Sequence, residues 1–161
     1  MIQIFTTGGT IEGIDLPNSD SIDRTKRSIE DHFIDANVDF DYSIECICDK
    51  DSRLLNKGDR QKLLDKILRT KTSKILITHG TFTMQNTAEF LGTKQLQKTI
   101  VLVGSFVLGN HINSDAAFNL GFALSAVQFL PLNVYVAMHG KVFIWNNVSK
   151  NIAANKFESN E

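Results

Sequence analysis

Short apolar, β-branched runs alternate with segments of helical period along most of the chain, and this alternation constrains the fold more than any other feature. The runs are Ile2 to Phe5, Lys74 to Thr78, Thr99 to Gly104 and Asn133 to Met138. Nearly continuous apolar runs are typical of strands buried on both faces, which occur in parallel sheets covered by helices. We therefore expect an α/β fold: a three-layer Rossmann-like or flavodoxin-like domain with a mostly parallel sheet. A turn at His139-Gly140 would lead into residues 141–145 and predicts a C-terminal β-hairpin.

Segments between these runs predict helices and one further strand. Asn56 with Asp59 resembles a helix N-cap, and Thr83 can cap the helix that follows the second run. A further helix is expected to open at Asn113 or Ser114 and to face inward with Ala117, Leu120, Gly121, Leu124 and Val127. Residues 38–48 alternate in polarity in the manner of a half-buried strand.

The length of 161 residues fits a single domain spanning residues 1–161. Within it, residues 13–37 differ from the rest because their first part is polar and rich in turn-forming residues. We expect a mobile surface loop there, followed by a short helix.

Charge and composition argue against several classes of partner. A net charge of -1 gives no electrostatic reason to bind nucleic acid or an anionic membrane. No apolar run approaches the ~18 residues of a spanning helix, and the N-terminus has no secretory-signal pattern. We expect a cytoplasmic protein.

The cysteines and histidines do not predict a metal site. Cys46 and Cys48 form a CxC pair with no second pair to complete four zinc ligands, so buried or half-buried reduced thiols are expected. We expect no metal and no cofactor. His79 is expected to have a structural hydrogen-bonding role, with general base as the alternative.

Polar segments follow several of the predicted strands. They are Thr6 to Thr10, Asp51 to Arg53, His79 to Thr83 and the residues from Gly104 onward. In open α/β sheets, ligands bind beyond the carboxyl ends of the strands, near a switch in strand order. These segments are therefore expected to meet at one edge of the sheet and to form the functional site.

The first of these segments, Thr6-Thr7-Gly8-Gly9-Thr10, has three interpretations. The paired glycines could serve only a turn that needs positive φ. Their N–H groups could cradle an anion, although the nucleotide-binding patterns GxGxxG and GxxxxGK[ST] are absent. Thr10 could also be a nucleophile, with neighbouring N–H groups as an oxyanion hole.

Two motifs carry a family resemblance. TTGGTIEG and ITHGTFTMQNTAEFL resemble the two signature segments of bacterial-type L-asparaginases. DSRLLNKGDRQKLLDKI, SDAAFNLGFALSAV and VYVAMHGKVFIWNNVSK resemble further segments of the same family, in the same order. The chain resembles the N-terminal domain of these enzymes, and its length resembles that of short single-domain asparaginase-like proteins.

The resemblance implies roles for individual residues. Thr10 matches the threonine that attacks the substrate amide, Thr81 matches the second catalytic threonine, and Lys150 matches the lysine paired with it. Ser52 matches the serine that contacts the substrate carboxylate, with Arg53 next to it on the substrate side. Gly9, Gly80 and Phe82 complete the expected substrate-binding set. From its position alone, Lys150 would read as a solvated surface lysine.

Three departures from the family pattern bear on function. Phe82 stands where the family has an aspartate that holds the substrate α-amino group. The loop after Thr10 has no evident counterpart of the family tyrosine, and the chain ends where the second domain of larger asparaginases begins. That domain contributes to a neighbouring subunit's site, so the resemblance also implies a homodimer or homotetramer.

The functional expectation is an asparaginase-like amidohydrolase with a threonine nucleophile. It would act on a small amide bearing a carboxylate, with activity weakened or altered by Phe82. The alternative is a non-catalytic relative that binds a small carboxylate or amide, or that serves as a subunit of a complex.

Overall fold

A single six-stranded sheet forms the centre of the molecule in the computed structural model, which describes residues 1–13 and 27–160. The strand order is β2-β1-β3-β4-β5-β6; the first five strands run parallel and β6 is antiparallel to β5. The strands are β1 (Ile2–Thr6), β2 (Tyr42–Cys46), β3 (Lys74–Thr78), β4 (Thr99–Val103), β5 (Asn133–Met138) and β6 (Lys141–Ile144). The predicted α/β fold with a mostly parallel sheet is confirmed.

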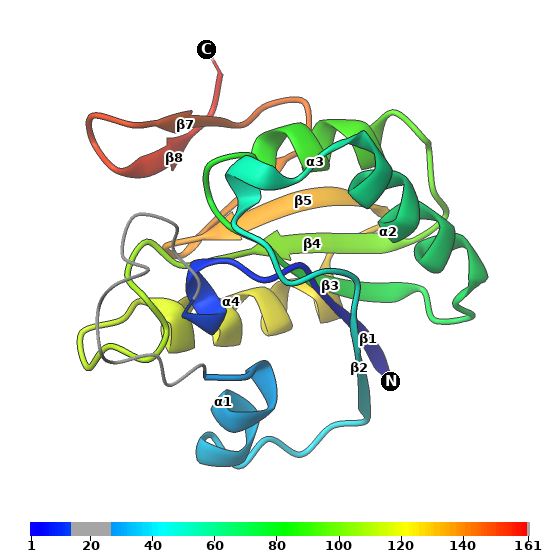
Figure 1. Ribbon diagram of the computed structural model, residues 1–161. Coiled ribbons are helices and arrows are strands. Elements are labelled where there is room, and N and C mark those ends of the chain that lie inside the picture. The colour runs from blue at the N-terminus through cyan, green and yellow to red at the C-terminus, as the bar shows by residue number, and fades with distance from the viewer. Residues whose placement is uncertain (14–26, 161) are drawn as a thin grey trace.

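Helices cover both faces of this sheet (Figure 1). One face carries α4 (Ala116–Phe129), and α1 (Ile29–Asp35) lies against α4 across a shallow apolar groove. The other face carries α2 (Lys57–Arg69) and α3 (Met84–Gly92). The central strands β3 and β4 are almost wholly buried between the two helical layers, as their continuous apolar sequences predict.

Local sequence signals explain where several elements begin and turn. Asn56 caps α2 in a capping box with Asp59, as predicted: each side chain accepts the backbone N–H of the other residue. The predicted hairpin of β5 and β6 is confirmed. Its turn places His139 at φ 50° and Gly140 at φ 76°, the left-handed pair that a tight two-residue hairpin requires.

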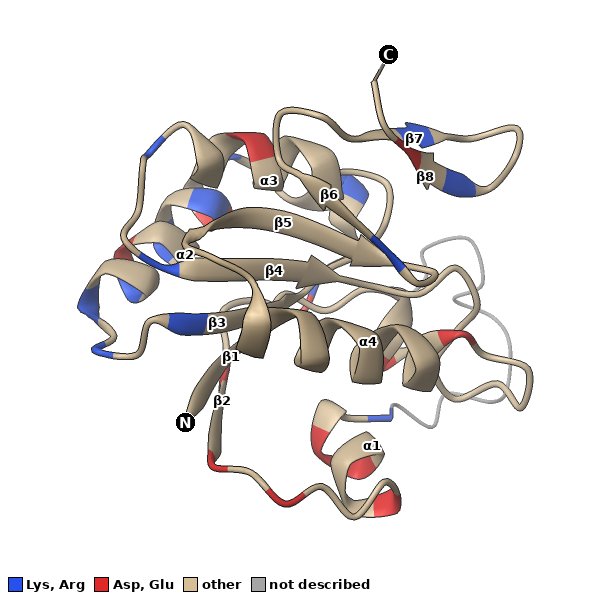
Figure 2. Cartoon of the chain, turned by 180° about the vertical axis from the view of Figure 1, so that it is seen from behind, with Lys and Arg blue, Asp and Glu red and all other residues tan. Residues whose placement is uncertain are grey.

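The start and the inward face of α4 differ from the prediction. The helix begins at Ala116, not at Asn113 or Ser114, and Ala117 and Gly121 are exposed. Before it, the carboxylate of Asp115 accepts the N–H groups of Phe106 and Val107, which holds the preceding residues in a loop. The helix carries no charged residue (Figure 2), so polarity did not mark its buried side.

Two other segments also differ from the prediction. The strand expected over residues 38–48 is confined to Tyr42–Cys46 at the edge of the sheet. Both cysteines are free thiols; Cys48 is half-buried as expected, but Cys46 is exposed. A second hairpin, β7 (Ser149–Asn151) with β8 (Lys156–Glu158), was not predicted.

The segment expected to be a loop and short helix is only partly described. Residues 14–26 lie outside the described part of the chain, whereas the short helix is present as α1, capped by Ser28. No helix among residues 1–13 and 27–160 is long and apolar enough to cross a membrane.

The strand order places a switch point between β1 and β3. The chain passes from β1 to β2 on one side and then to β3 and β4 on the other. The loops that leave β1 and β3 therefore diverge from adjacent strands, and ligands bind at such divergence points in open α/β sheets. The Thr7–Thr10 and His79–Thr83 segments both leave the sheet there.

Candidate active site

Three loops meet in close backbone contact at the switch point. Gly8 and Gly9 have φ values of 82° and 92°, so the turn that follows β1 does require positive φ. A Cβ added to Gly9 would stand 2.7 Å from the backbone nitrogen of Gly80, and one added to Gly80 would stand 2.7 Å from the Ser52 Oγ. The structure thus brings together the segments of Gly9, Gly80 and Ser52, which are far apart in sequence.

Thr10 opens a short 3-10 helix, η1 (Thr10–Glu12), and is half-buried. Its carbonyl accepts the N–H groups of Gly13 at 3.0 Å and Gly109 at 2.9 Å. The second of these bonds ties the Thr10 loop to the segment that follows β4. The backbone of Thr10 is therefore held from two sides.

Ser52 lies in the 3-10 helix η3 (Ser52–Leu54) and is almost fully buried. Thr83 Oγ1 donates to the Ser52 carbonyl at 2.7 Å, which explains why Thr83 precedes α3 without capping it through its side chain. Within the described part of the chain, the Ser52 Oγ has no hydrogen-bond partner. A buried hydroxyl without a partner is costly unless a ligand or water satisfies it.

Lys150 reaches the site from β7, in the hairpin that was not predicted. Its Nζ donates to Thr81 Oγ1 at 2.8 Å, and Thr81 itself is buried. Burial lowers the pKa of Lys150, and the nearby Arg53 guanidinium lowers it further. Lys150 is therefore not the solvated surface lysine that its position in the sequence suggested.

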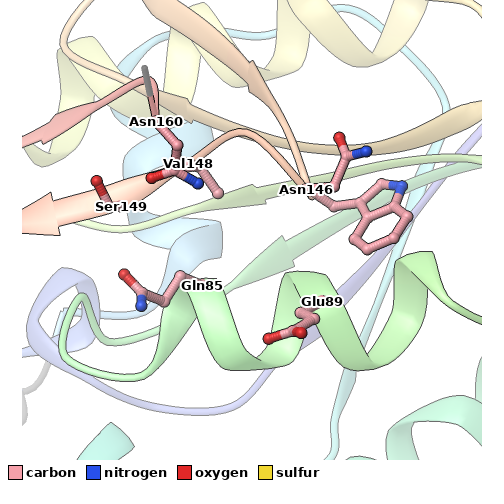
Figure 3. Close-up of a pocket in the computed structure, with 7 residues that line it drawn as sticks. Gln85, Glu89, Asn146, Val148, Ser149 and Asn160 are labelled. Carbon is pink, nitrogen blue, oxygen red and sulfur yellow. The ribbon is translucent and has the colours of Figure 1, made fainter.

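A cleft of about 270 Å³ borders the same hairpin on the α3 side. Figure 3 shows Gln85 and Glu89 on α3 opposite Val148 and Ser149. Gln85 Oε1 also accepts the backbone N–H of Lys150 at 3.0 Å. Gln85 thereby fixes β7 against α3 and helps to place Lys150 at the site.

Phe82 lies at the tip of the loop after β3 and is 49% exposed, so it does not belong to the core. Lys150 Nζ lies 3.9 Å from the centroid of its ring, and Arg53 Cζ lies 4.6 Å from it. Lys150 Nζ also lies 5.1 Å from the ring of Phe106. The aromatic side chain at the centre of the site is therefore in contact with two cations.

Arg53 is held in place by Asp51, which is buried. Arg53 Nε and Nη2 donate to the two carboxylate oxygens at 2.9 and 2.7 Å, and the Arg53 backbone N–H donates to Oδ1 at 2.8 Å. Such two-point pairing fixes the plane of the guanidinium. Arg53 is thus presented beside Phe82 in a defined orientation.

His79 is the first residue after β3 and is fully buried. Its Nδ1 is 2.7 Å from the Gly80 carbonyl oxygen and its Nε2 is 2.8 Å from Thr87 Oγ1. Because a carbonyl only accepts, Nδ1 carries the proton and Nε2 accepts from Thr87. Burial lowers the pKa of His79 to about 4, so the ring is neutral near pH 7. These bonds match the structural role expected for His79.

Three supporting residues had no role predicted from the sequence: Gln85, and Asp51 and Phe106, which lie in segments expected at the site. Asp51 directly precedes the Ser-Arg pair and could have been noticed as its partner. Gln85 and Phe106 have no local signal, because each contacts Lys150 from a distant part of the chain. No three His, Cys, Asp or Glu side chains of the described ranges gather into a metal site.

Comparison with known proteins shows which family the chain resembles. The family described as "Asparaginase, N-terminal" matches residues 1–161. L-asparaginase 2 of Escherichia coli (strain K12) is 30% identical over 164 residues, which cover 92% of this chain and 46% of that protein. A glutaminase-asparaginase of Acinetobacter glutaminasificans is 28% identical over 168 residues, covering 94% of this chain and 50% of that protein.

A solved structure extends the likeness to three dimensions. A probable cytoplasmic L-asparaginase from Campylobacter jejuni superposes with a TM-score of 0.81 at 29% identity, over 98% of this chain and 51% of that one. The chain therefore spans about half the length of the relatives it matches. Its match to the family extends from the first residue to the last, and the chain belongs to the asparaginase N-terminal family.

Proposed function

We propose that this chain is an amidohydrolase that converts the amide of a small, carboxylate-bearing compound into the acid and ammonia. Thr10 is the nucleophile. Thr81 and Lys150 together accept a proton from the attacking water and return it to Thr10. Ser52 and Arg53 bind the carboxylate of the substrate. The contact that carries this proposal is the 2.8 Å hydrogen bond from Lys150 Nζ to Thr81 Oγ1.

The reaction proceeds by acyl transfer. The hydroxyl oxygen of Thr10 bonds to the amide carbon, its proton passes to the leaving nitrogen, the C–N bond breaks, and ammonia departs. Water then attacks the Thr10 ester after losing a proton to the Thr81–Lys150 pair. Cleavage of the ester C–O bond releases the acid and returns the proton to Thr10, so the net reaction is amide plus water to acid plus ammonia.

The environment of Lys150 supports its role. A lysine acts as a base in its neutral form, and burial together with Arg53 lowers the pKa of Lys150, which raises the fraction of the neutral form available beside the protonated one. The buried hydroxyl of Ser52, which lacks a partner in the described part of the chain, supports a ligand contact beside Gly80. The chain covers about half the length of relatives named L-asparaginase and glutaminase-asparaginase, and amide hydrolysis is the chemistry that these names have in common.

A second candidate is a non-catalytic protein that binds a small carboxylate or amide, or that acts as a subunit of a complex. Phe82 is the observation in its favour, because an aromatic ring at the loop tip offers no hydrogen-bond acceptor to a substrate. Both candidates use the same site residues. They differ in whether Thr10 forms a covalent bond.

Ammonia release from a panel of amides separates the two candidates. The panel contains L-asparagine, L-glutamine and succinamate. We expect release from at least one amide by the unaltered chain and a loss of about a thousandfold or more in Thr10→Ala, as expected when a nucleophile is removed. The matched control is Thr93→Ala at the exposed end of α3, which should retain full activity. Unchanged activity in Thr10→Ala would exclude Thr10 as the nucleophile, and no release from any amide would favour the binding protein.

A further inference from the structure

Two cationic side chains share one aromatic ring at the candidate site. Lys150 Nζ lies 3.9 Å and Arg53 Cζ 4.6 Å from the centroid of Phe82. Cations are attracted to the negative face of an aromatic ring, whereas the ring edge carries partial positive charge. Phe82 is half-exposed, so a ligand group beside the ring would also approach these two side chains.

The carboxylate of Asp51, which lies near this ring, is already paired with Arg53. Asp51 is buried, and its carboxylate accepts three hydrogen bonds from Arg53. Within residues 1–13 and 27–160, Lys150 forms no ion pair, and its Nζ donates to a neutral hydroxyl on Thr81. Asp51, the carboxylate that these contacts bring near Phe82, is thus already bound to Arg53.

The charge arrangement decides which ligand groups are tolerated there. An ammonium placed beside Phe82 would lie close to the protonated form of Lys150, and like charges at contact distance repel one another. The Arg53 guanidinium on the same ring adds to this repulsion only in part, because Asp51 balances its charge. A carboxylate at the same place would be attracted by these cations. A neutral group would not be repelled by them. The Ser52 Oγ, buried beside Gly80, can still donate one hydrogen bond to a carboxylate.

We propose that this site selects ω-amides of carboxylic acids that carry no ammonium group, such as the monoamide of an unsubstituted dicarboxylic acid, over amino-acid amides. The proposal rests on the proposed amidohydrolase function for its reaction, but the selectivity is a property of binding. The product acid would be selected in the same way, because it keeps every group of the substrate except the amide nitrogen.

Binding of two acids tests the selectivity without any turnover. Succinate and L-aspartate differ only by the α-ammonium group, and calorimetric titration gives the dissociation constant of each. We expect succinate to bind about tenfold more tightly than L-aspartate, a ratio that corresponds to ~1.4 kcal/mol. Equal or tighter binding of L-aspartate, or no binding of either acid at millimolar concentration, would overturn the proposal.

Substitutions at the ring locate the source of the selectivity. Phe82→Asp supplies the missing carboxylate and should reverse the preference toward L-aspartate. Phe82→Leu removes the ring without adding charge, and the preference for succinate should persist because both cations remain. A preference unchanged in Phe82→Asp would show that Phe82 does not face the ligand.

Two lysine variants distinguish the effect of a charge beside Phe82 from the effect of the net charge of the molecule. Lys150→Met removes one of the two cations beside Phe82 and should reduce the succinate preference severalfold. The matched control is Lys156→Met on β8 of the same hairpin, an exposed lysine paired with Glu158, which should leave the ratio unchanged. Equal effects of the two variants would assign the preference to net charge and overturn the proposal.

Ammonia release measured in parallel keeps this inference distinct from the proposed function. Preferential succinate binding without ammonia release from succinamate would reject the amidohydrolase and retain the selectivity. Ammonia release from L-asparagine at a higher kcat/KM than from succinamate would reject the selectivity and retain the amidohydrolase.

Discussion

Phe82 occupies a loop tip where a large apolar side chain is half-exposed, and its two cationic neighbours explain how it is accommodated. Each exposed cation–π contact contributes ~0.5–1 kcal/mol, and both Arg53 and Lys150 lie within 5 Å of the ring centroid. The methylene stems of these side chains also cover apolar surface. Phe82 is thus held by the functional groups of the site and not by the core.

His79 makes stability depend on pH. Its pKa is about 4 in the folded chain and near 6.5 when unfolded, so the unfolded chain binds more protons between these values. The stabilisation is complete above pH 6.5 and is lost as the pH falls toward 4. We expect the free energy of unfolding to be roughly 2 kcal/mol lower at pH 5 than at pH 7 on account of this residue.

Urea unfolding at the two pH values measures this effect. His79→Gln is the comparison, because glutamine can donate to the Gly80 carbonyl but does not titrate. The difference between pH 5 and pH 7 should shrink by most of that amount in His79→Gln. His32, whose pKa burial also lowers, contributes equally to both proteins. An identical pH dependence in the two proteins would contradict the assignment to His79.

At the scale of elements, the site depends on three loops that pack backbone against backbone. The turn after β1, the loop after β3 and the η3 helix approach one another at glycines, where even one methyl group would collide with main-chain or Ser52 atoms. A shift of any one loop would therefore displace Thr10, Thr81 or Ser52 relative to the others. Catalysis of the proposed kind is sensitive to displacements of about 1 Å.

Gly80→Ala tests this packing. The new Cβ would stand 2.7 Å from Ser52 Oγ and 2.8 Å from Ser52 Cβ, so Ser52 or the loop after β3 must move. We expect a loss of ~1–3 kcal/mol in the free energy of unfolding from overpacking, together with lower affinity for succinate. Urea unfolding and calorimetric titration check the two effects.

Gly121→Ala is the matched control for that substitution. Gly121 is exposed in the middle of α4, and a Cβ there has no neighbouring atom within 4 Å. Replacing an exposed helical glycine by alanine stabilises by ~0.5–1 kcal/mol. If both variants lost stability equally, contact at the switch point would not explain the effect at Gly80.

At the scale of the whole molecule, the candidate site lies at the carboxyl edge of the sheet, and the β7–β8 hairpin reaches over it from the C-terminal part of the chain (Figure 1). Several large apolar side chains of the described residues are exposed, among them Ile112, Phe118 and Phe129. Uncovered apolar surface favours association.

We expect the chain to form a homodimer or homotetramer with closed symmetry. Light scattering coupled to size-exclusion chromatography should give at least twice the chain mass of 18.0 kDa at micromolar concentration. A mass of one chain across that concentration range would contradict this expectation. The measurement is independent of the ligand and of Thr10.

The sequence by itself determined the fold class and most of the elements. Continuous apolar runs such as Lys74–Thr78 fixed the central strands, because only a strand buried on both faces is apolar at every position. The Asn56–Asp59 box fixed the start of α2, and His139-Gly140 fixed the hairpin turn, because capping and turn chemistry act within a few residues. The resemblance to a known family, and not local physical chemistry, singled out Thr10, Ser52 and Thr81 as candidate site residues.

The tertiary structure decided what depends on contacts between distant segments. The position of Lys150 near the end of the chain gave no local sign of a partner, and only the family resemblance paired it with Thr81. The fold places its Nζ on Thr81 Oγ1, 69 residues away in the sequence. The inward face predicted for α4 was wrong at Ala117 and Gly121, because a helix without charged residues has no strongly polar face to mark its exposed side. The contacts of Phe82 with Arg53 and Lys150 join three segments of the chain. The chemistry of each side chain can be read from the sequence. The charge around Phe82 depends on residues that only folding brings close to the ring.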